Sequence, residues 1–243
     1  MRSMFKFTTI IIIGLVFLIL IIGYIRYINT QMNEAAKIKQ CQGSIEAYMG
    51  IRTLSAKLEA PDINCPTEYT TVTSKDKEVI KKEVVDKIAR CWKMWKKGDY
   101  VFLDKIAPED ASQMSTTYCH ICEVSDFKNK GIIITEEDMR TYFNNNKIDG
   151  KSIISTLNPV YDPPIGELTE NHPAPKLTVQ AWQDTLIQQV DTSSTYAIAY
   201  NEVVTFKKTK YNLFSAHMSY PMLVKYDAEG LKYCSMTIAE QKT

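Results

Sequence analysis

Hydrophobic and polar positions divide the chain into an apolar start, a helical stretch of mixed character and a long region that ends in alternating patterns. The run from Phe7 to Ile25 contains no charged residue. At about 1.5 Å per residue in a helix, this run spans roughly 28 Å, close to the hydrocarbon thickness of a bilayer. We therefore predict a single transmembrane helix within residues 1–28, with membrane lipid as the partner of Phe7–Ile25.

A cleaved signal peptide is the alternative for this segment. Signal peptides usually have an apolar core of about 7–15 residues, followed by small residues at the cleavage site. Here the core is longer, and the bulky rings of Tyr24 and Tyr27 follow where small residues would be needed. Such rings suit the headgroup level of a membrane, and Lys6 and Arg26 bracket the run. We favour a retained anchor.

The next stretch is helical in pattern and amphipathic. From Thr30 to about Leu58, apolar residues recur at three- and four-residue steps, and no proline interrupts the chain before Pro61. We expect the membrane helix to continue into a stalk over residues 29–60, which offers a surface for a protein partner or for self-association. The recurring residues are Ile38, Cys41, Ile45 and Tyr48.

The predicted head, residues 61–243, opens with a strand and a long helix. Residues 67–73 are rich in β-formers, and Ser74 is expected to cap a helix from Lys75 to Lys97 that stops at Gly98. This helix carries nine basic and four acidic residues. Because carboxylates are interspersed among the basic residues, we interpret this surface as a solvated face and not as a site for anionic lipid or an acidic partner. Its predicted buried stripe is Ile80, Val84, Ile88, Cys91, Trp92 and Trp95.

Weaker signals follow along the chain. A short buried strand is predicted at Ile132–Ile134, and Thr135 with three acids after it predicts the start of a helix. A short helix is expected at 152–157 and an exposed proline-rich loop at 158–175.

The last third predicts strands. Residues 196–206 are β-formers, and Met222–Tyr226 with Leu231–Ile238 is expected to form a hairpin around Asp227–Gly230. The expected fold class is therefore α+β, with helices early and an antiparallel sheet late.

Six cysteines follow the apolar run. An even number in a domain of this size fits an oxidising compartment and up to three disulfides, although reduced cysteines packed as small apolar residues are the alternative. Six cysteines allow 15 pairings. Reach allows one of these pairings, Cys65–Cys91: the strand after Cys65 and the helix that ends at Cys91 have similar lengths, and the two sulfurs could meet if the chain folds back antiparallel. The six are Cys41, Cys65, Cys91, Cys119, Cys122 and Cys234.

Cys119-His120-Ile121-Cys122, expected in a loop, is the only short motif with reactive potential. Such a pair can exchange disulfides, but redox-active pairs usually open a helix in a βαβ unit, and none is predicted here. A zinc site would need distant ligands such as Cys234, His172 or His217. A structural disulfide is the favoured interpretation. No catalytic set, cofactor or metal site is predicted, and a net charge of +1 gives no general attraction to nucleic acid.

The order of these features resembles a group of membrane-anchored, cysteine-containing proteins of small-genome, DPANN-type archaea. The resemblance rests on the membrane helix and Cys41, then Cys65-Pro66-Thr67, Cys91-Trp92 and Tyr118-Cys119-His120-Ile121-Cys122. It implies a cell-surface location and disulfide chemistry, but no activity. A looser likeness is to type IV pilin-like subunits, from which the chain departs because its apolar run holds no acidic residue.

These observations predict a single-pass, membrane-anchored binding or scaffold protein, stabilised by disulfides. The basic residues Arg2 and Lys6 before the span, together with the cysteines after it, place the head outside the cytoplasm. Two alternatives stay open: a pilin-like filament subunit, and a thiol-disulfide oxidoreductase that uses Cys119 and Cys122.

Overall fold

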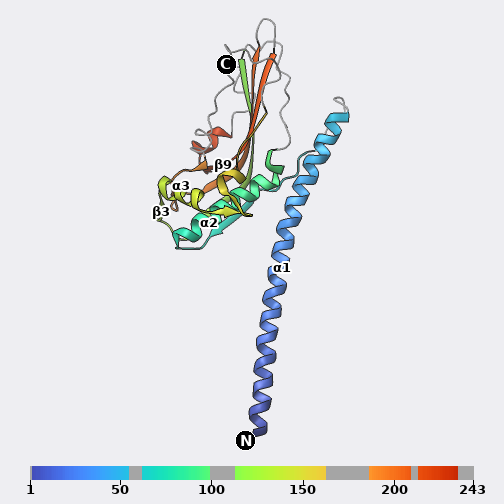
Figure 1. Cartoon of the computed structure of the whole chain (residues 1–243), viewed down its shortest axis with the longest axis vertical. Coiled ribbons are helices and arrows are strands. Elements are labelled where there is room, and N and C mark those ends of the chain that lie inside the picture. Colours follow the sequence, from blue (N-terminus) through green and yellow to red (C-terminus); the bar gives the residue numbers. More distant parts are fainter. Residues whose placement is uncertain (1, 55–61, 99–112, 163–185, 209–212, 235–243) are drawn as a thin grey trace.

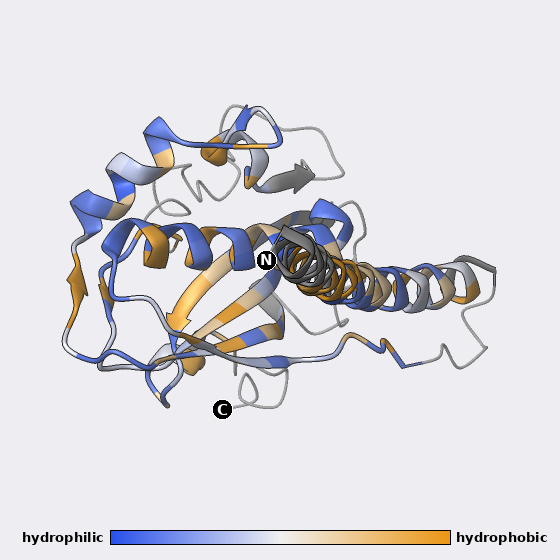
Figure 2. Ribbon diagram, turned by 90° about the horizontal axis from the view of Figure 1, so that it is seen from below, coloured by the Kyte–Doolittle hydropathy of each residue, from blue (hydrophilic) through white to orange (hydrophobic). Residues whose placement is uncertain are grey.

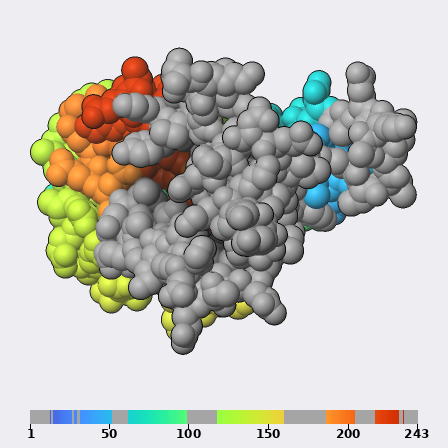
Figure 3. Space-filling view, turned by 90° about the horizontal axis from the view of Figure 1, so that it is seen from above, coloured from blue at the N-terminus to red at the C-terminus, as the bar shows by residue number. Residues whose placement is uncertain are grey.

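The computed structural model describes residues 2–54, 62–98, 113–162, 186–208 and 213–234. Its first element, α1 (Arg2–Leu54), is one unbroken helix of 53 residues. At about 1.5 Å per residue it is roughly 80 Å long. Figure 1 shows it as a rod that extends well beyond the head, and Figure 3 shows from above that its blue atoms lie to one side of the head. The expected continuation of the apolar helix into a second helical half is confirmed as far as Leu54.

The proline that was expected to end the stalk falls within 55–61, outside the described residues. Within the part of the chain whose side chains are described, no helix combines the length and the apolar character needed to cross a membrane.

The head is built on a five-stranded sheet with the order β1-β2-β8-β9-β6. β1 runs parallel to β2, and the other neighbouring strands are antiparallel. The expected α+β class, with an antiparallel sheet late in the chain, is confirmed. The strands are β1 (Glu68–Val72), β2 (Gln113–Phe127), β6 (Val160–Asp162), β8 (Tyr196–Lys208) and β9 (Leu213–Lys225).

Smaller elements surround this sheet. Two two-stranded sheets pair β3 with β7 and β4 with β5. The remaining elements are α2 (Lys77–Met94), η1 (Lys96–Gly98), β3 (Ile133–Ile134), α3 (Glu136–Asn145), β4 (Lys147–Ile148), β5 (Lys151–Ser152), α4 (Ile153–Thr156), β7 (Val190–Asp191) and η2 (Gly230–Tyr233).

Helix α2 packs its apolar stripe against β8 and β9 at the centre of the head. All six residues of the predicted stripe are buried, which confirms that prediction. The ring of Trp95 stacks on that of Tyr200 with centroids 4.5 Å apart, and the ring of Trp92 lies 6.1 Å from the same tyrosine. This stack joins α2 to the middle of the sheet.

The boundaries of α2 differ from the prediction at both ends. Asp76 rather than Ser74 is the N-cap, because its carboxylate accepts the Glu78 N–H at 2.7 Å. Ser74 accepts the N–H of Asp76 and so shapes the turn before the cap. At the other end, α2 ends at Met94 and not at Lys97 as predicted. Lys96 and Lys97 have positive φ values of 51° and 58°, which are not helical.

The predicted α3 start is confirmed in detail. Thr135 and Asp138 form a reciprocal capping box, in which each side chain accepts the other residue's backbone N–H. The side chains of Met139 and Phe143 are buried below this helix. The short strand at 133–134 and the short helix at 153–156 also form where the pattern places them.

Two predictions about strands are wrong. The Cys119–Cys122 motif lies on the long strand β2 and not in a loop. The late hairpin does not form as expected, because β9 begins at Leu213 and pairs with β8, and the chain after Lys225 turns into η2. Local turn chemistry indicated a hairpin, but the partner of residues 222–225 is the preceding long strand.

Prolines occur within or next to two of the strands, β9 and β6. Pro221 interrupts the β-pattern of β9, but β6 pairs only with residues 217–219, so no neighbouring strand needs the missing N–H of Pro221 on that side. The expected loop at 158–175 contains β6 at its start, and 163–175 lie outside the described ranges.

Candidate functional site

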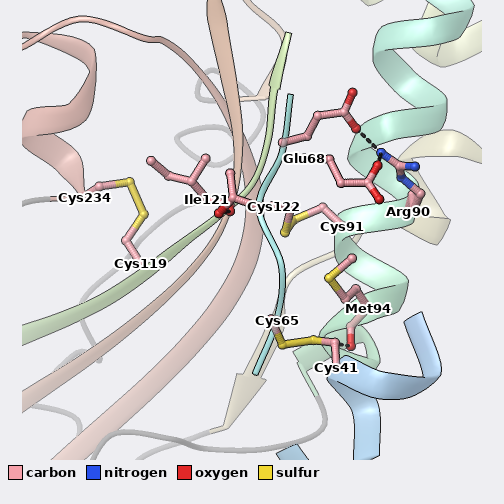
Figure 4. Close-up of a disulfide and its surroundings, with 12 residues drawn as sticks. Cys41, Cys65, Glu68, Arg90, Cys91, Met94, Cys119, Ile121, Cys122 and Cys234 are labelled. Atoms are coloured by element: carbon pink, nitrogen blue, oxygen red, sulfur yellow. Dashed lines mark hydrogen bonds and ion pairs between the residues drawn. A yellow bond between two sulfur atoms is a disulfide. The ribbon is translucent and has the colours of Figure 1, made fainter. Parts of the chain in front are cut away.

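Three disulfides brace the head: Cys41–Cys65, Cys91–Cys122 and Cys119–Cys234 (Figure 4). All six cysteines are paired. The predicted Cys65–Cys91 bridge is therefore wrong. The reason is the strand order. β1 pairs with β2, which leaves Cys65 next to Cys41 of α1, and Cys122 of β2 lies next to Cys91 of α2.

The two cysteines of the C-x-x-C motif do not bond to each other. The pairing of β2 with β8 shifts register between Ile121 and Glu123, at Cys122, and the two cysteines reach different partners: Cys119 bonds to Cys234, and Cys122 bonds to Cys91 on α2. A redox-active pair must be able to close its own disulfide after it attacks a substrate. This arrangement gives structural bridges, and it lends the oxidoreductase alternative no support.

His120 lies between these two cysteines and packs against Trp95, with ring centroids 5.0 Å apart. Burial lowers the pKa of His120 to about 4, and a hydrogen bond to the Cys65 backbone opposes this shift only in part. The imidazole is therefore neutral at physiological pH. Among the described residues, no group of three or more His, Cys, Asp or Glu side chains is placed to hold a metal ion.

A buried carboxylate is the centre of an ionic network next to α1. Glu123 on β2 is 1% exposed, and its carboxylate pairs with Lys87 and Arg90 of α2. The hydroxyl of Thr70 on β1 donates to the same carboxylate. Burial alone would raise the pKa of Glu123, but the hydrogen bonds from Lys87 and Thr70 and the two positive charges outweigh it and hold the pKa below its usual value.

The network extends outward to α1. Arg90 also pairs with Glu68 of β1 at 2.8 Å and with Glu34 of α1 at 3.6 Å, and Lys37 of α1 pairs with Glu68 at 2.8 Å. Burial would lower the pKa of Arg90, but Glu123 and the other carboxylates raise it. Three cations thus face three carboxylates, and the network carries no net charge. It joins α1, β1, α2 and β2.

A groove of about 750 Å³ lies over this network. It is lined by α1 from Glu34 to Gln42, by α2 and η1 from Glu83 to Lys97, and by Ile148, Asp149 and Thr156. Glu123 and Thr70 contribute to the lining from the sheet. Its volume is within the range of ligand pockets. Sequence reasoning missed this groove because its lining comes from segments that lie far apart in the chain.

A second buried polar cluster lies between β8 and β9. The hydroxyl of Tyr200 donates to Ser219 at 3.0 Å, and Ser219 Oγ lies 2.9 Å from Nε2 of His217. Glu202 Oε1 lies 3.4 Å from that same nitrogen. All four side chains are at most 2% exposed. The sequence signal that could have found them is the i, i+2 spacing on two neighbouring strands.

This cluster lacks the geometry of a serine nucleophile site. A Ser-His-acid relay needs the serine and the acid on opposite imidazole nitrogens. Here both lie at Nε2, and Nδ1 of His217 has no hydrogen-bond partner among the described groups. The four side chains instead connect two central strands through polar contacts.

Comparisons with family models, curated proteins and solved structures gave no match for this chain. The candidate site therefore rests on geometry alone, and it is the groove beside α1.

Proposed function

We propose that this protein is a single-pass, membrane-anchored binding or scaffold protein whose disulfide-braced head lies outside the cytoplasm. The observation that carries the proposal is the apolar half of α1. Its large apolar residues between Ile13 and Ile25 are each 46–65% exposed, including every residue from Leu15 to Ile22. Eight consecutive exposed residues cover all sides of a helix, and Figure 2 colours this stretch orange through successive turns.

A helix that is apolar on all sides needs an apolar environment around it. Among the described residues, Cys41 and Gln42 in the second half of α1 contact α2, and Figure 1 shows the apolar first half extending away from the described part of the head. Lipid is the partner that can surround such a helix completely. The charge-free run from Phe7 to Ile25 has the length that a bilayer requires.

The disulfides support the assignment of the head to an oxidising compartment. All six cysteines form three disulfides, and none of these disulfides joins Cys119 to Cys122. Structural disulfides of this kind are typical of extracytoplasmic proteins and rare in the cytosol. Binding is favoured over catalysis, because the described polar clusters are either neutralised or closed to a substrate.

Extraction of membranes tests the anchor. Wild-type protein should stay with the bilayer at alkaline pH and float with vesicles. Leu18→Lys together with Leu20→Lys should release it, because each charge at the centre of a membrane helix costs about 2.5–3.5 kcal/mol. Met32→Lys is the matched control, since Met32 is equally exposed on α1 but lies outside the apolar run. Release of the wild type, or equal release of both variants, would refute the anchor.

A filament subunit is the second candidate, and the continuity of α1 favours it. Pilin-like assembly requires one long helix whose second half packs on a head, as Cys41 and Ile45 do here. Electron microscopy of purified full-length protein, with N-terminal sequencing, separates the two candidates. Ordered fibres with a trimmed N-terminus would favour the filament, and non-fibrous particles with intact Met1 would exclude it.

A further inference from the structure

The groove beside α1 has an ordered distribution of charge along α2. Glu83 lies near the start of the groove-lining face, and Lys93 and Lys97 lie at its end. Ten positions of α2 separate Glu83 from Lys93, which is about 15 Å, and Lys97 follows in η1. Between them lie Asp86, which pairs with Lys82, and Lys87 and Arg90, whose charges are neutralised in the Glu123 network. Along this face the charge therefore changes from acidic at Glu83, through a neutral middle, to basic at Lys93 and Lys97.

The charges at both ends are available to another molecule. Within the described part of the chain, Glu83, Lys93 and Lys97 have no ion-pair partner. Lys39 of α1 adds to the basic end, because the neighbouring Gln42 side chain donates to the Lys93 carbonyl at 2.8 Å. The lysines also suit the negative end of the α2 dipole, but this role does not require them to line a groove.

The length and chemistry of the groove select one kind of occupant. A span of about 15 Å matches roughly four to five residues of extended polypeptide. Small apolar side chains such as Ala35, Ile38 and Ala89 line part of the groove and suit a short uncharged centre of such a segment. A nucleic acid would meet repulsion at Glu83, and a lipid tail would meet charges at both ends.

We propose that this groove binds a polypeptide segment of a partner protein, with a basic residue at one end, an uncharged centre and an acidic residue at the other. This inference rests on the proposed binding function and specifies its partner. The basic residue pairs with Glu83, and the acidic residue pairs with Lys93, Lys97 and Lys39. The neutral network beneath the groove keeps α1 and α2 at a fixed separation.

The experiment measures binding of labelled nine-residue peptides to the full-length protein in detergent by fluorescence polarisation. One peptide has three lysines, an Ala-Leu-Ala centre and three glutamates. The others replace all six charged residues by glutamine, by lysine or by glutamate. We expect the mixed peptide to bind about tenfold more tightly than the glutamine peptide at low ionic strength, and less so at higher salt.

Charge reversal at one end makes the expectation sharper. Lys93→Glu with Lys97→Glu gives an acidic groove that should prefer the all-lysine peptide, and Glu83→Lys gives a basic groove that should prefer the all-glutamate peptide. The matched control is Lys75→Glu with Lys128→Glu, two exposed lysines that do not line the groove. It should leave the preference for the mixed peptide unchanged.

Two results would overturn the proposal: a mixed peptide that binds no more tightly than the glutamine peptide, or a control variant that changes the preference as much as the groove variants do. Because binding is measured in detergent, it does not depend on membrane insertion. A failed extraction test would remove the anchor and leave the groove result standing, whereas a failed peptide test would do the reverse.

Discussion

At the scale of single residues, the centre of the head is a stack of aromatic rings bordered by buried polar groups. Trp92 of α2 and Trp95, the C-cap of that helix, lie against Tyr200, whose hydroxyl reaches Ser219 in the polar cluster. Burial, followed by the charge of Glu202, raises the pKa of Tyr200 well above its ordinary value. The phenol therefore stays protonated and keeps donating its hydrogen bond over the whole physiological pH range.

Trp92→Ala should destabilise the protein severely. The indole is 2% exposed, and removal of a large buried aromatic typically costs about 3–5 kcal/mol, which is comparable with the whole stability of many domains. Chemical denaturation of the full-length protein in detergent measures the effect. Tyr69→Ala is the control, because that side chain is 74% exposed and its loss should change stability by less than about 0.5 kcal/mol. An unchanged midpoint for Trp92→Ala would show that the ring is not part of the core.

Glu123 should make the free energy of unfolding depend on pH in the acidic range. Its pKa is lowered in the folded protein, so its contribution is complete above the ordinary glutamate value of 4.5 and is lost as the pH falls through the lower folded value. Urea unfolding from pH 7 to pH 3 should therefore show a steeper loss of stability in wild type than in Glu123→Gln. Glu136→Gln, an exposed carboxylate on α3, is the control and should keep the wild-type slope. Equal slopes for wild type and Glu123→Gln would contradict the network.

At the scale of elements, the disulfide pairing gives a sharp test by peptide mapping. No lysine or arginine separates Cys119 from Cys122, so both remain in one tryptic peptide. The pairing therefore predicts one two-peptide species that joins Cys41 to Cys65. It also predicts one three-peptide species in which the Cys119–Cys122 peptide holds those of Cys91 and Cys234.

Mass spectrometry of the unreduced digest, compared with a reduced digest as control, identifies these species. A peptide pair that joins Cys65 to Cys91 would contradict the strand order of the head. So would a Cys119–Cys122 peptide closed on itself.

The elements predicted correctly are those whose signals are local. The stripe of α2 repeats every three or four residues, and the Thr135 capping box needs only four consecutive residues. The disulfide pairing, the place of Cys119–Cys122 on a strand and the groove depend on which strands become neighbours. That order is set by packing between segments far apart in the chain. Local turn residues misled the hairpin prediction at 227–230 for the same reason.

At the scale of the whole molecule, α1 and the head form a connected unit. The Cys41–Cys65 disulfide and the ion pairs from Glu34 and Lys37 attach the second half of α1 to α2 and β1. The first half extends beyond the head with its apolar side chains exposed (Figure 1). An apolar rod fixed to a disulfide-braced head fits the membrane-anchored, extracytoplasmic function that we propose.

The most direct measurement is thiol labelling of intact cells with a membrane-impermeant maleimide, before and after treatment with an impermeant reductant. All six cysteines are bridged, so the account predicts no labelling before reduction and labelling after it, without lysis. A cytoplasmic protein labelled only after lysis serves as the control for cell integrity. Labelling of free thiols that appears only after lysis, with no need of reductant, would contradict both the disulfides and the location of the head.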